Sequence, residues 1–189
     1  MTTLFIVIGL LLVAGAAGYA LLEKRPGYGA YFGLARLAGG KLDIGSVDFA
    51  TLARRRSGND ALVCPPGHCH GARADREAKI YDMAPEELLA RMKKVALAEP
   101  KTRLVDGGTD RDPAARFVQY SRRMHFPDTI DVNVMPAGAG QSTLAIYSRS
   151  LLGSRDFGVN KARVARWLRC LSMDVTMARF RFRGPGAKV

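Results

Sequence analysis

The sequence predicts an α+β protein, in which an antiparallel four- to five-stranded meander is packed by two helices and preceded by one transmembrane helix. Three features predict it: an uncharged apolar run near the start, strand-like segments between residues 101 and 150, and two segments with apolar residues at helical spacing. Of the 189 residues, 48% are hydrophobic, which is enough for one domain of ordinary size plus an anchor.

The apolar run extends from Leu4 to Leu22 and contains no charged residue. As a helix it would be roughly 28 Å long, close to the thickness of a hydrocarbon core. Ala14-Gly15-Ala16 also fits the cleavage site of a signal peptide, but residues 1–3 carry no Lys or Arg, which a signal peptide normally has at its start. We therefore expect a retained anchor.

The chain then divides into an N-terminal tip (1–3), a transmembrane anchor (4–22), a juxtamembrane linker rich in glycine and aromatic residues (23–46), a basic α+β domain (47–172) and a basic C-terminal tail (173–189). Within the anchor, Ala14 and Gly18 form a small-x-x-x-small pair, which permits close approach of a second transmembrane helix. A membrane-protein partner is therefore expected. The alternative is an anchor that is merely rich in Ala and Gly.

Residues 43–75 are rich in Gly, Pro and Arg with little periodicity, which predicts an extended, loop-rich segment. A first short strand is predicted at Ala78–Tyr81. The longer strands are predicted at Lys101–Asp106, Ala114–Arg123, Asp128–Met135 and Ser142–Ser150. In the third of these, Ile130, Val132 and Val134 alternate with polar residues, so one face of the sheet should be dry and the other wet.

Two helices complete the predicted domain. The first begins at Pro85, with Glu86 and Glu87 in its first turn, and ends before Pro100. The second is predicted to begin with Asn160 as its N-cap and to reach about Ser172. The basic segment from Arg179 onward is predicted as a final edge strand or a loose basic arm.

Four potential metal ligands lie within seven residues: Cys64, His68, Cys69 and His70. They are enough in number for zinc, but adjacent ligands seldom all point inward and no second pair of ligands accompanies them. A local disulfide between Cys64 and Cys69 is favoured if the domain lies outside the cytoplasm, and two reduced thiols if it lies inside. Cys170 is predicted to be a small core residue.

No catalytic residue is predicted, and no cofactor is expected. Asp156-Phe157-Gly158 spells the metal-binding triplet of protein kinases, but no Gly-rich phosphate loop or His-Arg-Asp loop accompanies it. Asp128 and Asp131 should point to opposite faces of their strand, which argues against shared acid–base work.

The net charge of +12 favours anionic partners. Because the predicted anchor brings the domain to a membrane, anionic membrane lipid is the simplest such partner. Nucleic acid is disfavoured, although Arg179-Phe180-Arg181-Phe182-Arg183 interleaves basic and aromatic residues.

Several short motifs carry a resemblance to a known family: Phe126-Pro127-Asp128, Tyr147-Ser148-Arg149-Ser150, Asp156-Phe157-Gly158, Asn160, Arg163 and Trp167-Leu168. Over about residues 47–171 the chain resembles the uncharacterised domain family 1499 (DUF1499). The resemblance implies a bacterial or photosynthetic origin and no agreed activity. It implies no catalytic residue, but it singles out six positions: Phe126, Asp128, Arg149, Asp156, Asn160 and Arg163. An ion pair between Arg149 and Asp156 is expected to hold the turn before the last helix.

The leading interpretation is a membrane-anchored, non-enzymatic accessory or interaction protein of the bacterial inner membrane. The alternatives are a domain that binds a small amphipathic ligand or lipid, and a redox or metal module centred on Cys64 and Cys69. The basic residues that follow the anchor favour a cytoplasmic domain, whereas a disulfide would favour the periplasm.

Overall fold

The structure is a computed structural model, and it describes residues 42–54, 58–108, 113–120, 126–151 and 158–182, with side chains described up to residue 174 of the last segment. The predicted anchor, with Ala14 and Gly18, and most of the predicted linker lie outside these residues. Within the part of the chain that is described, no helix has both the length and the apolar character needed to cross a membrane.

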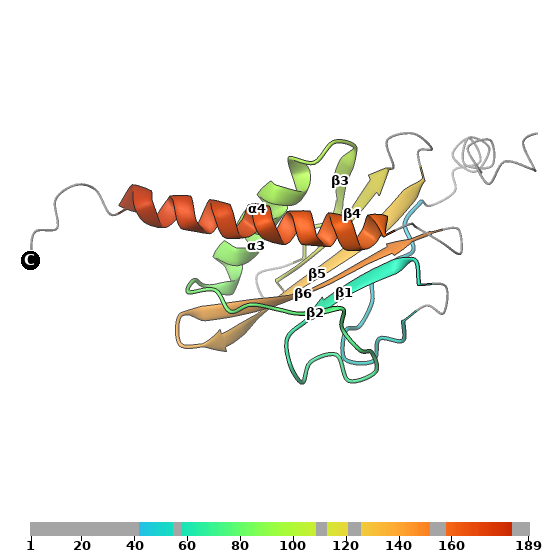
Figure 1. Cartoon of the computed structure of the whole chain (residues 1–189), viewed down its shortest axis with the longest axis horizontal. Coiled ribbons are helices and arrows are strands. Elements are labelled where there is room, and N and C mark those ends of the chain that lie inside the picture. Colours follow the sequence, from blue (N-terminus) through green and yellow to red (C-terminus); the bar gives the residue numbers. More distant parts are fainter. Residues whose placement is uncertain (1–41, 55–57, 109–112, 121–125, 152–157, 183–189) are drawn as a thin grey trace, which may run out of the picture.

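Six strands form one mixed sheet with the order β2-β1-β6-β5-β4-β3 (Figure 1). Their bounds are β1 Asp60–Cys64, β2 Arg76–Glu77, β3 Thr102–Asp106, β4 Ala114–Tyr120, β5 Pro127–Gly138 and β6 Gln141–Ser150. The meander from β3 to β6 is antiparallel throughout, as predicted. The sheet continues beyond it, because β1 pairs antiparallel with β6 and β2 pairs parallel with β1.

Strand β1 lies in the segment that was expected to be a loop-rich connection. All five of its residues are buried. Ala61 and Val63 pack into the core under the helices, whereas Leu62 and Cys64 pack on the opposite face. Because both faces are covered, the strand lacks the alternation of polar and apolar residues that marks a half-exposed strand.

The prediction of a short strand at Ala78–Tyr81 is wrong, because these residues form no strand. The parallel edge strand β2 is only two residues long and ends before Ala78. Tyr81 instead makes an isolated antiparallel bridge with Ser142 of β6.

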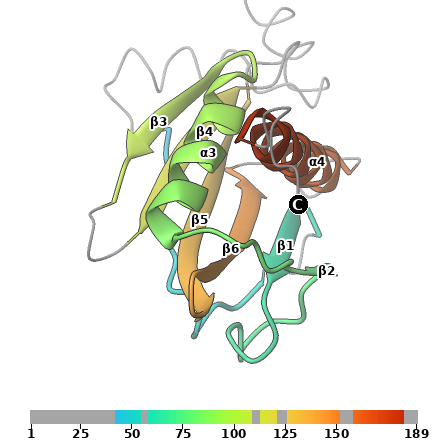
Figure 2. The same cartoon turned by 90° about the vertical axis from the view of Figure 1, so that its left-hand side faces the viewer.

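Both helices cover the same face of the sheet (Figure 2). Helix α3 spans Pro85–Leu97 and begins at the predicted proline. Helix α4 spans Val159–Phe182, ten residues beyond the predicted end at Ser172. The expectation of an edge strand or loose arm from Arg179 is therefore wrong for residues 179–182, which are helical, while residues 183–189 lie outside the described part.

The main core lies between these helices and the sheet. Trp167 of α4 is fully buried and meets Phe117 of β4 edge-on, with 5.7 Å between the ring centroids. Ile130, Val132 and Val134 of β5 join this core, as the alternation in the sequence predicts.

The opposite face of the sheet is also covered, by residues 42–54. Phe49 and Leu52 pack there against Leu62 and Tyr147. Asp131, on this face, is only 5% exposed, so the expectation of a wet face is wrong at this strand. The sheet is therefore the middle layer of three, and polar side chains on its second face must find partners within the protein.

Candidate functional site

A buried polar network lies between α4 and the sheet, and Arg163 is its centre. Arg163 is 2% exposed and donates hydrogen bonds to Asp128 of β5 and to Gln119 of β4. Its other terminal nitrogen donates to Ser148 Oγ at 2.9 Å and to Asn160 Oδ1 at 2.6 Å. One guanidinium therefore joins α4 to three neighbouring strands.

Asn160 strengthens the same junction instead of capping α4. Its amide nitrogen donates to the carbonyl of Asn59 and to Ser150 Oγ, both at 3.0 Å. Ser148 Oγ donates to its amide oxygen at 2.5 Å. The predicted N-cap role is wrong, because α4 begins one residue earlier and the side chain is fully buried against β1 and β6.

A second buried ion pair lies on the other face of the sheet, beneath residues 42–54. Arg149 of β6 lies 3.2 Å from the carboxylate of Asp131 on β5 and donates to the carbonyl of Gly45. Its guanidinium also lies 5.3 Å from the ring centroid of Tyr147. The expected partner, Asp156, lies outside the described residues. Within the described part, Arg149 pairs with Asp131, on the face away from the helices.

The segment that begins at Leu42 is attached to this face by polar contacts. Asp43 accepts a hydrogen bond from Arg116 Nε at 2.9 Å and one from Thr129 Oγ1 at 3.2 Å. The amide of Ile44 donates to the same threonine oxygen at 3.1 Å. Asp43 and Ile44 are thus joined to β4 and to β5 near its start.

A cavity of about 240 Å³ opens between this segment and strands β4 and β5. Asp131, Arg116 and Ser46 are among the residues that line it. Burial raises the pKa of Asp131 to about 7, although the positive charges of Arg149 and Arg116 act in the opposite direction. Asp131 is therefore a buried carboxylate whose protonation changes near neutral pH.

Cys64 and Cys69 are joined as a disulfide, with 6.3 Å between their Cα atoms. With both sulfurs in this bond, neither offers a thiolate to a metal, and no group of three or more potential ligands is assembled among the described residues. His68 lies beside Phe49, with 6.3 Å between the ring centroids. Cys170 is a free thiol and is exposed, so its prediction as a core residue is wrong.

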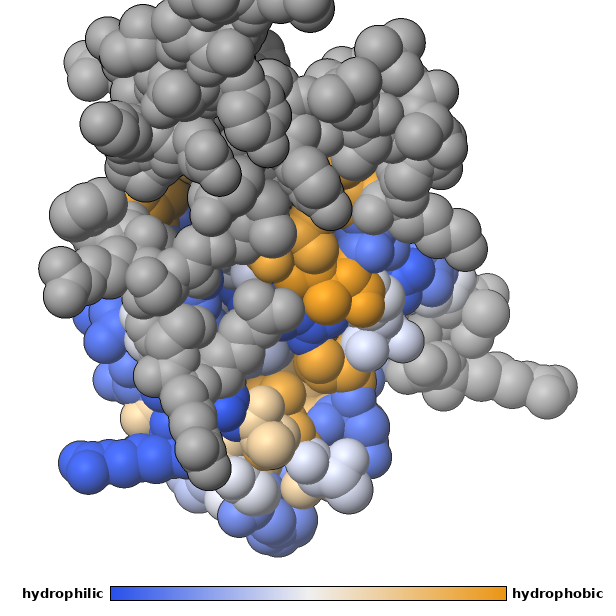
Figure 3. Space-filling view, turned by 90° about the vertical axis from the view of Figure 1, so that its right-hand side faces the viewer, coloured by the Kyte–Doolittle hydropathy of each residue, from blue (hydrophilic) through white to orange (hydrophobic). Residues whose placement is uncertain are grey.

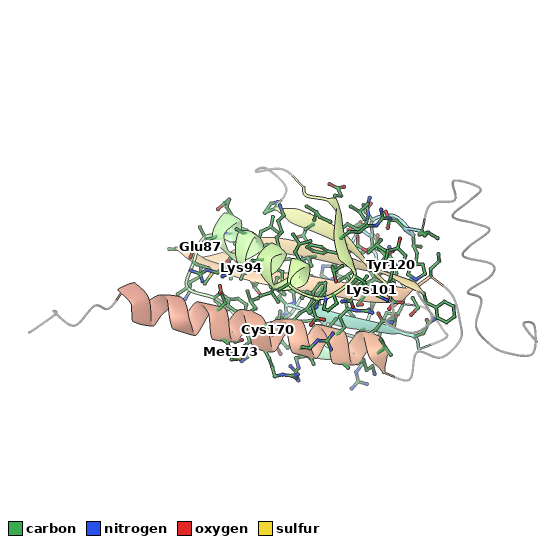
Figure 4. All side chains as sticks on the ribbon, turned by 90° about the horizontal axis from the view of Figure 1, so that it is seen from above. Glu87, Lys94, Lys101, Tyr120, Cys170 and Met173 are labelled. Atoms are coloured by element: carbon green, nitrogen blue, oxygen red, sulfur yellow. A yellow bond between two sulfur atoms is a disulfide. The ribbon has the colours of Figure 1, made fainter. Side chains whose placement is uncertain are left out.

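A groove, here called the α4 groove, runs between α4 and the edge of the sheet formed by β1 and β2. It consists of two hollows of about 220 and 320 Å³, which share Arg76 and Leu168. The first hollow is lined by Val63 of β1 and by Val164 of α4. The second is lined by Tyr81, Ser172 and Met173, among others. Figure 4 labels Cys170 and Met173 on α4 and Lys94 on α3.

Three basic residues border the second hollow: Arg76, Lys79 and Arg169. All three are exposed, and none forms a salt bridge with another described residue. Glu77 is the carboxylate on this rim. At the first hollow, in contrast, Asp75 is held by Arg54 at 2.9 Å and by Lys161 at 3.1 Å. The second hollow is therefore the part of the groove with an excess of unpaired positive charge.

The fold defines the class of this protein as a small α+β domain with a mixed six-stranded sheet and two helices on one face. Residues 64–171 match the family described as "Protein of unknown function (DUF1499)", and the chain belongs to that family. This confirms the resemblance, with a match that begins at residue 64 where residue 47 was expected.

Among solved structures, the chain is similar to the crystal structure of the protein TTHA0849 from Thermus thermophilus. The two share 11% identity and a TM-score of 0.30, and the similarity covers 53% of this chain and 95% of that one. A similarity this low carries no argument about function. No curated protein matches the chain.

The structure brings three residues of the family motif together, namely Asp128, Asn160 and Arg163. Phe126 lies half-buried just before β5, and Arg149 lies on the opposite face of the sheet. Sequence reasoning missed Gln119 and Ser148 as partners of Arg163. The alternation of each strand assigns both residues to the helix-facing side, which is the signal that could have identified them.

We expect Arg163→Ala to lower the free energy of unfolding by about 3–5 kcal/mol, because the substitution leaves the Asp128 carboxylate charged, buried and unpaired. Arg169→Ala, an exposed change in the same helix, should stay within about 0.5 kcal/mol of the unsubstituted protein. Adding Asp128→Asn to Arg163→Ala should restore part of the loss. Urea unfolding of the full-length chain in mild detergent measures all three, and equal losses for Arg163→Ala and Arg169→Ala would contradict the prediction.

The raised pKa of Asp131 predicts a specific dependence of stability on pH. Between the ordinary value of 3.8 and about 7, the folded protein holds a proton on Asp131 that the unfolded chain has released. The free energy of unfolding should therefore fall, relative to that of Asp131→Asn, by up to about 1.4 kcal/mol per pH unit as the pH rises through this range. Denaturation of both proteins from pH 4 to 8 measures this difference. A difference that stays constant or grows with pH would disprove the assignment.

Proposed function

We propose that this protein is a membrane-tethered, non-enzymatic accessory domain that is held against a bacterial inner membrane and contacts its anionic lipid. The observation that carries the proposal is the attachment of residues 42–45 to the sheet by Asp43, Ile44 and Gly45. Residues 23–41, which lie outside the described part, connect this segment to the predicted anchor at 4–22. We infer that the end of the domain at which the segment attaches is the end that faces the membrane.

The end of the sheet at which this segment attaches has apolar surface. Strand β6 ends there, β5 begins there, and α4 begins there with Val159, which is 47% exposed. Figure 3, which views this end of the molecule, shows hydrophobic surface near the middle of the face. Apolar side chains at the attached end suit contact with the boundary between headgroups and acyl chains.

The buried charged side chains form ion pairs with one another inside the fold. This favours a binding role over a catalytic one. Arg163 with Asp128 and Arg149 with Asp131 pair with each other beneath covering layers. Exposed cations without a salt bridge to another described residue lie instead on the surface, and some of this kind gather at the α4 groove, namely Arg76, Lys79 and Arg169. Basic residues near an anionic membrane surface each contribute about 1 kcal/mol to binding.

The disulfide between Cys64 and Cys69 favours the periplasmic side of the membrane for the domain, because disulfides persist in oxidising compartments. The basic residues after the anchor favour the cytoplasm, but long domains are translocated largely regardless of such charges. We therefore assign the domain to the periplasm.

Retention of the anchor is tested by washing membrane vesicles with alkaline carbonate. The full-length chain should remain with the membranes, since residues 4–22 are long enough to span the hydrocarbon core. Leu11→Arg combined with Leu12→Arg should release it, because each central charge opposes insertion by about 2.5–3.5 kcal/mol. Release of the unsubstituted chain, or a mature protein that begins near Ala17, would overturn the tether.

The same preparation tests for a membrane-protein partner. After extraction in mild detergent, a tagged chain should co-purify with its partner, and Ala14→Ile with Gly18→Ile should reduce this association. A lone monomer without lipid preference would contradict the accessory role.

The location of the domain is tested by counting reactive thiols in the native protein. The chain has three cysteines. Before reduction, alkylation should modify Cys170 alone, and after reduction and unfolding it should modify all three. The Cys170→Ser variant should give no modification before reduction and two afterwards. Three modified cysteines in the unreduced protein would place the domain in a reducing compartment instead.

A further inference from the structure

One wall of the α4 groove is an apolar stripe on the helix. Val164, Leu168 and Ser172 follow one another at intervals of four residues, so their side chains lie along one face. Val164 is buried and Leu168 is partly covered. Met173 lies beside this stripe, lines the second hollow and is 67% exposed. A methionine in this position adapts its shape readily to an apolar ligand. The stripe therefore runs from the covered core to open surface.

The positive charges that lack a carboxylate partner gather around the second hollow of the groove. Asp75 at the first hollow is neutralised by Arg54 and Lys161. Arg76, Lys79 and Arg169 at the second hollow have no carboxylate partner among the described residues, and Glu77 offsets only one of them. A ligand that fits both features has an apolar chain and an anionic head, and guanidinium and ammonium groups both bind phosphate well.

We propose that the α4 groove binds a single anionic phospholipid, with an acyl chain along the stripe of α4 and the headgroup phosphate at Arg76, Lys79 and Arg169. The site deepens the proposed function, because the tether supplies the membrane from which the lipid comes. The other occupant with suitable chemistry is an acidic amphipathic helix of a partner protein. The lipid is favoured because the predicted anchor keeps this domain beside a bilayer at all times.

Trp167 provides a direct assay, because it is the only tryptophan in the chain and precedes Leu168 on α4. The full-length chain in non-ionic detergent is mixed with phosphatidylglycerol that carries bromine atoms on its acyl chains. Bound acyl chains should quench the fluorescence of Trp167 in a saturable way. Phosphatidylcholine with the same brominated chains should need roughly tenfold more lipid for the same quenching, because its headgroup has no net charge.

Two pairs of matched variants separate the groove from general effects of charge and size. Arg76→Glu with Arg169→Glu should weaken quenching by phosphatidylglycerol at least roughly tenfold. Arg73→Glu with Arg103→Glu makes the same change in net charge at exposed positions that do not line the groove, and should leave quenching unchanged. Ala165→Phe fills the first hollow and should abolish quenching, whereas Ala90→Phe on the exposed face of α3 should not.

Three results would overturn the lipid site: equal quenching by the two lipids, equal quenching in groove and control variants, or full displacement of phosphatidylglycerol by inorganic phosphate. Loss of a co-purifying protein in Arg76→Glu with Arg169→Glu, without any change in quenching, would assign the groove to a partner helix instead. Because the assay uses purified protein in detergent, it is independent of carbonate retention. A failed tether and a failed lipid site are therefore distinguishable.

Discussion

The buried pair of Arg163 and Asp128 determines how helix α4 lies on the sheet. The guanidinium also binds Gln119 and Ser148, so a shift of α4 in any direction would break a bond to β4, β5 or β6. Taking both charges out of water is expensive, and the pair adds little to stability over an apolar replacement. Its effect is on specificity, since only one position of α4 satisfies every partner. The position of α4 on the sheet therefore also determines the shape of the α4 groove.

A second buried ion pair, between Arg149 and Asp131, lies on the face of the sheet opposite to the first. Asp128 points toward the helices, whereas Asp131, three residues later on β5, points to the other face and meets Arg149. Residues 42–54 cover this second pair, and the carbonyl of Gly45 accepts a hydrogen bond from the same arginine. The covering segment and the sheet therefore depend on each other: without the segment Asp131 would be hydrated, and without Arg149 the segment would lose a central attachment.

Elements marked by alternating polar and apolar residues, or by a clear end signal, could be predicted from the sequence even where both faces are buried. The meander β3–β6 and the start of α3 follow from alternation and from Pro85. Strand β1 could not be predicted because it is buried on both faces, and β2 because two residues carry no period. The end of α4 was missed because Arg179-Phe180-Arg181-Phe182-Arg183 alternates basic and aromatic residues with a period of two, which is typical of a strand and not of a helix.

The buried network was only partly predictable, for a related reason. The family motif identified Arg163, Asn160 and Asp128 as a set, but not which face each would point to. Asn160 has the residue type of an N-cap, and propensity alone assigns it that role. The side chain instead reaches the carbonyl of Asn59, immediately before β1, which the sequence did not reveal as a strand. Arg149 was assigned to a nearby acid in sequence, whereas its partner Asp131 is adjacent only through the pairing of β5 with β6.

The α4 groove follows from a mismatch of lengths at the edge of the sheet. Helix α4 has 24 residues, about 36 Å, whereas β1 beneath it has five residues, about 17 Å, and β2 has two. The sheet therefore ends before the helix does, and the apolar stripe continues past the strands that could bury it. Side chains such as Met173 are left on open surface, where an apolar ligand would remove them from water. Arg169 of α4, with Arg76 and Lys79 across the groove, favours a ligand with an anionic head.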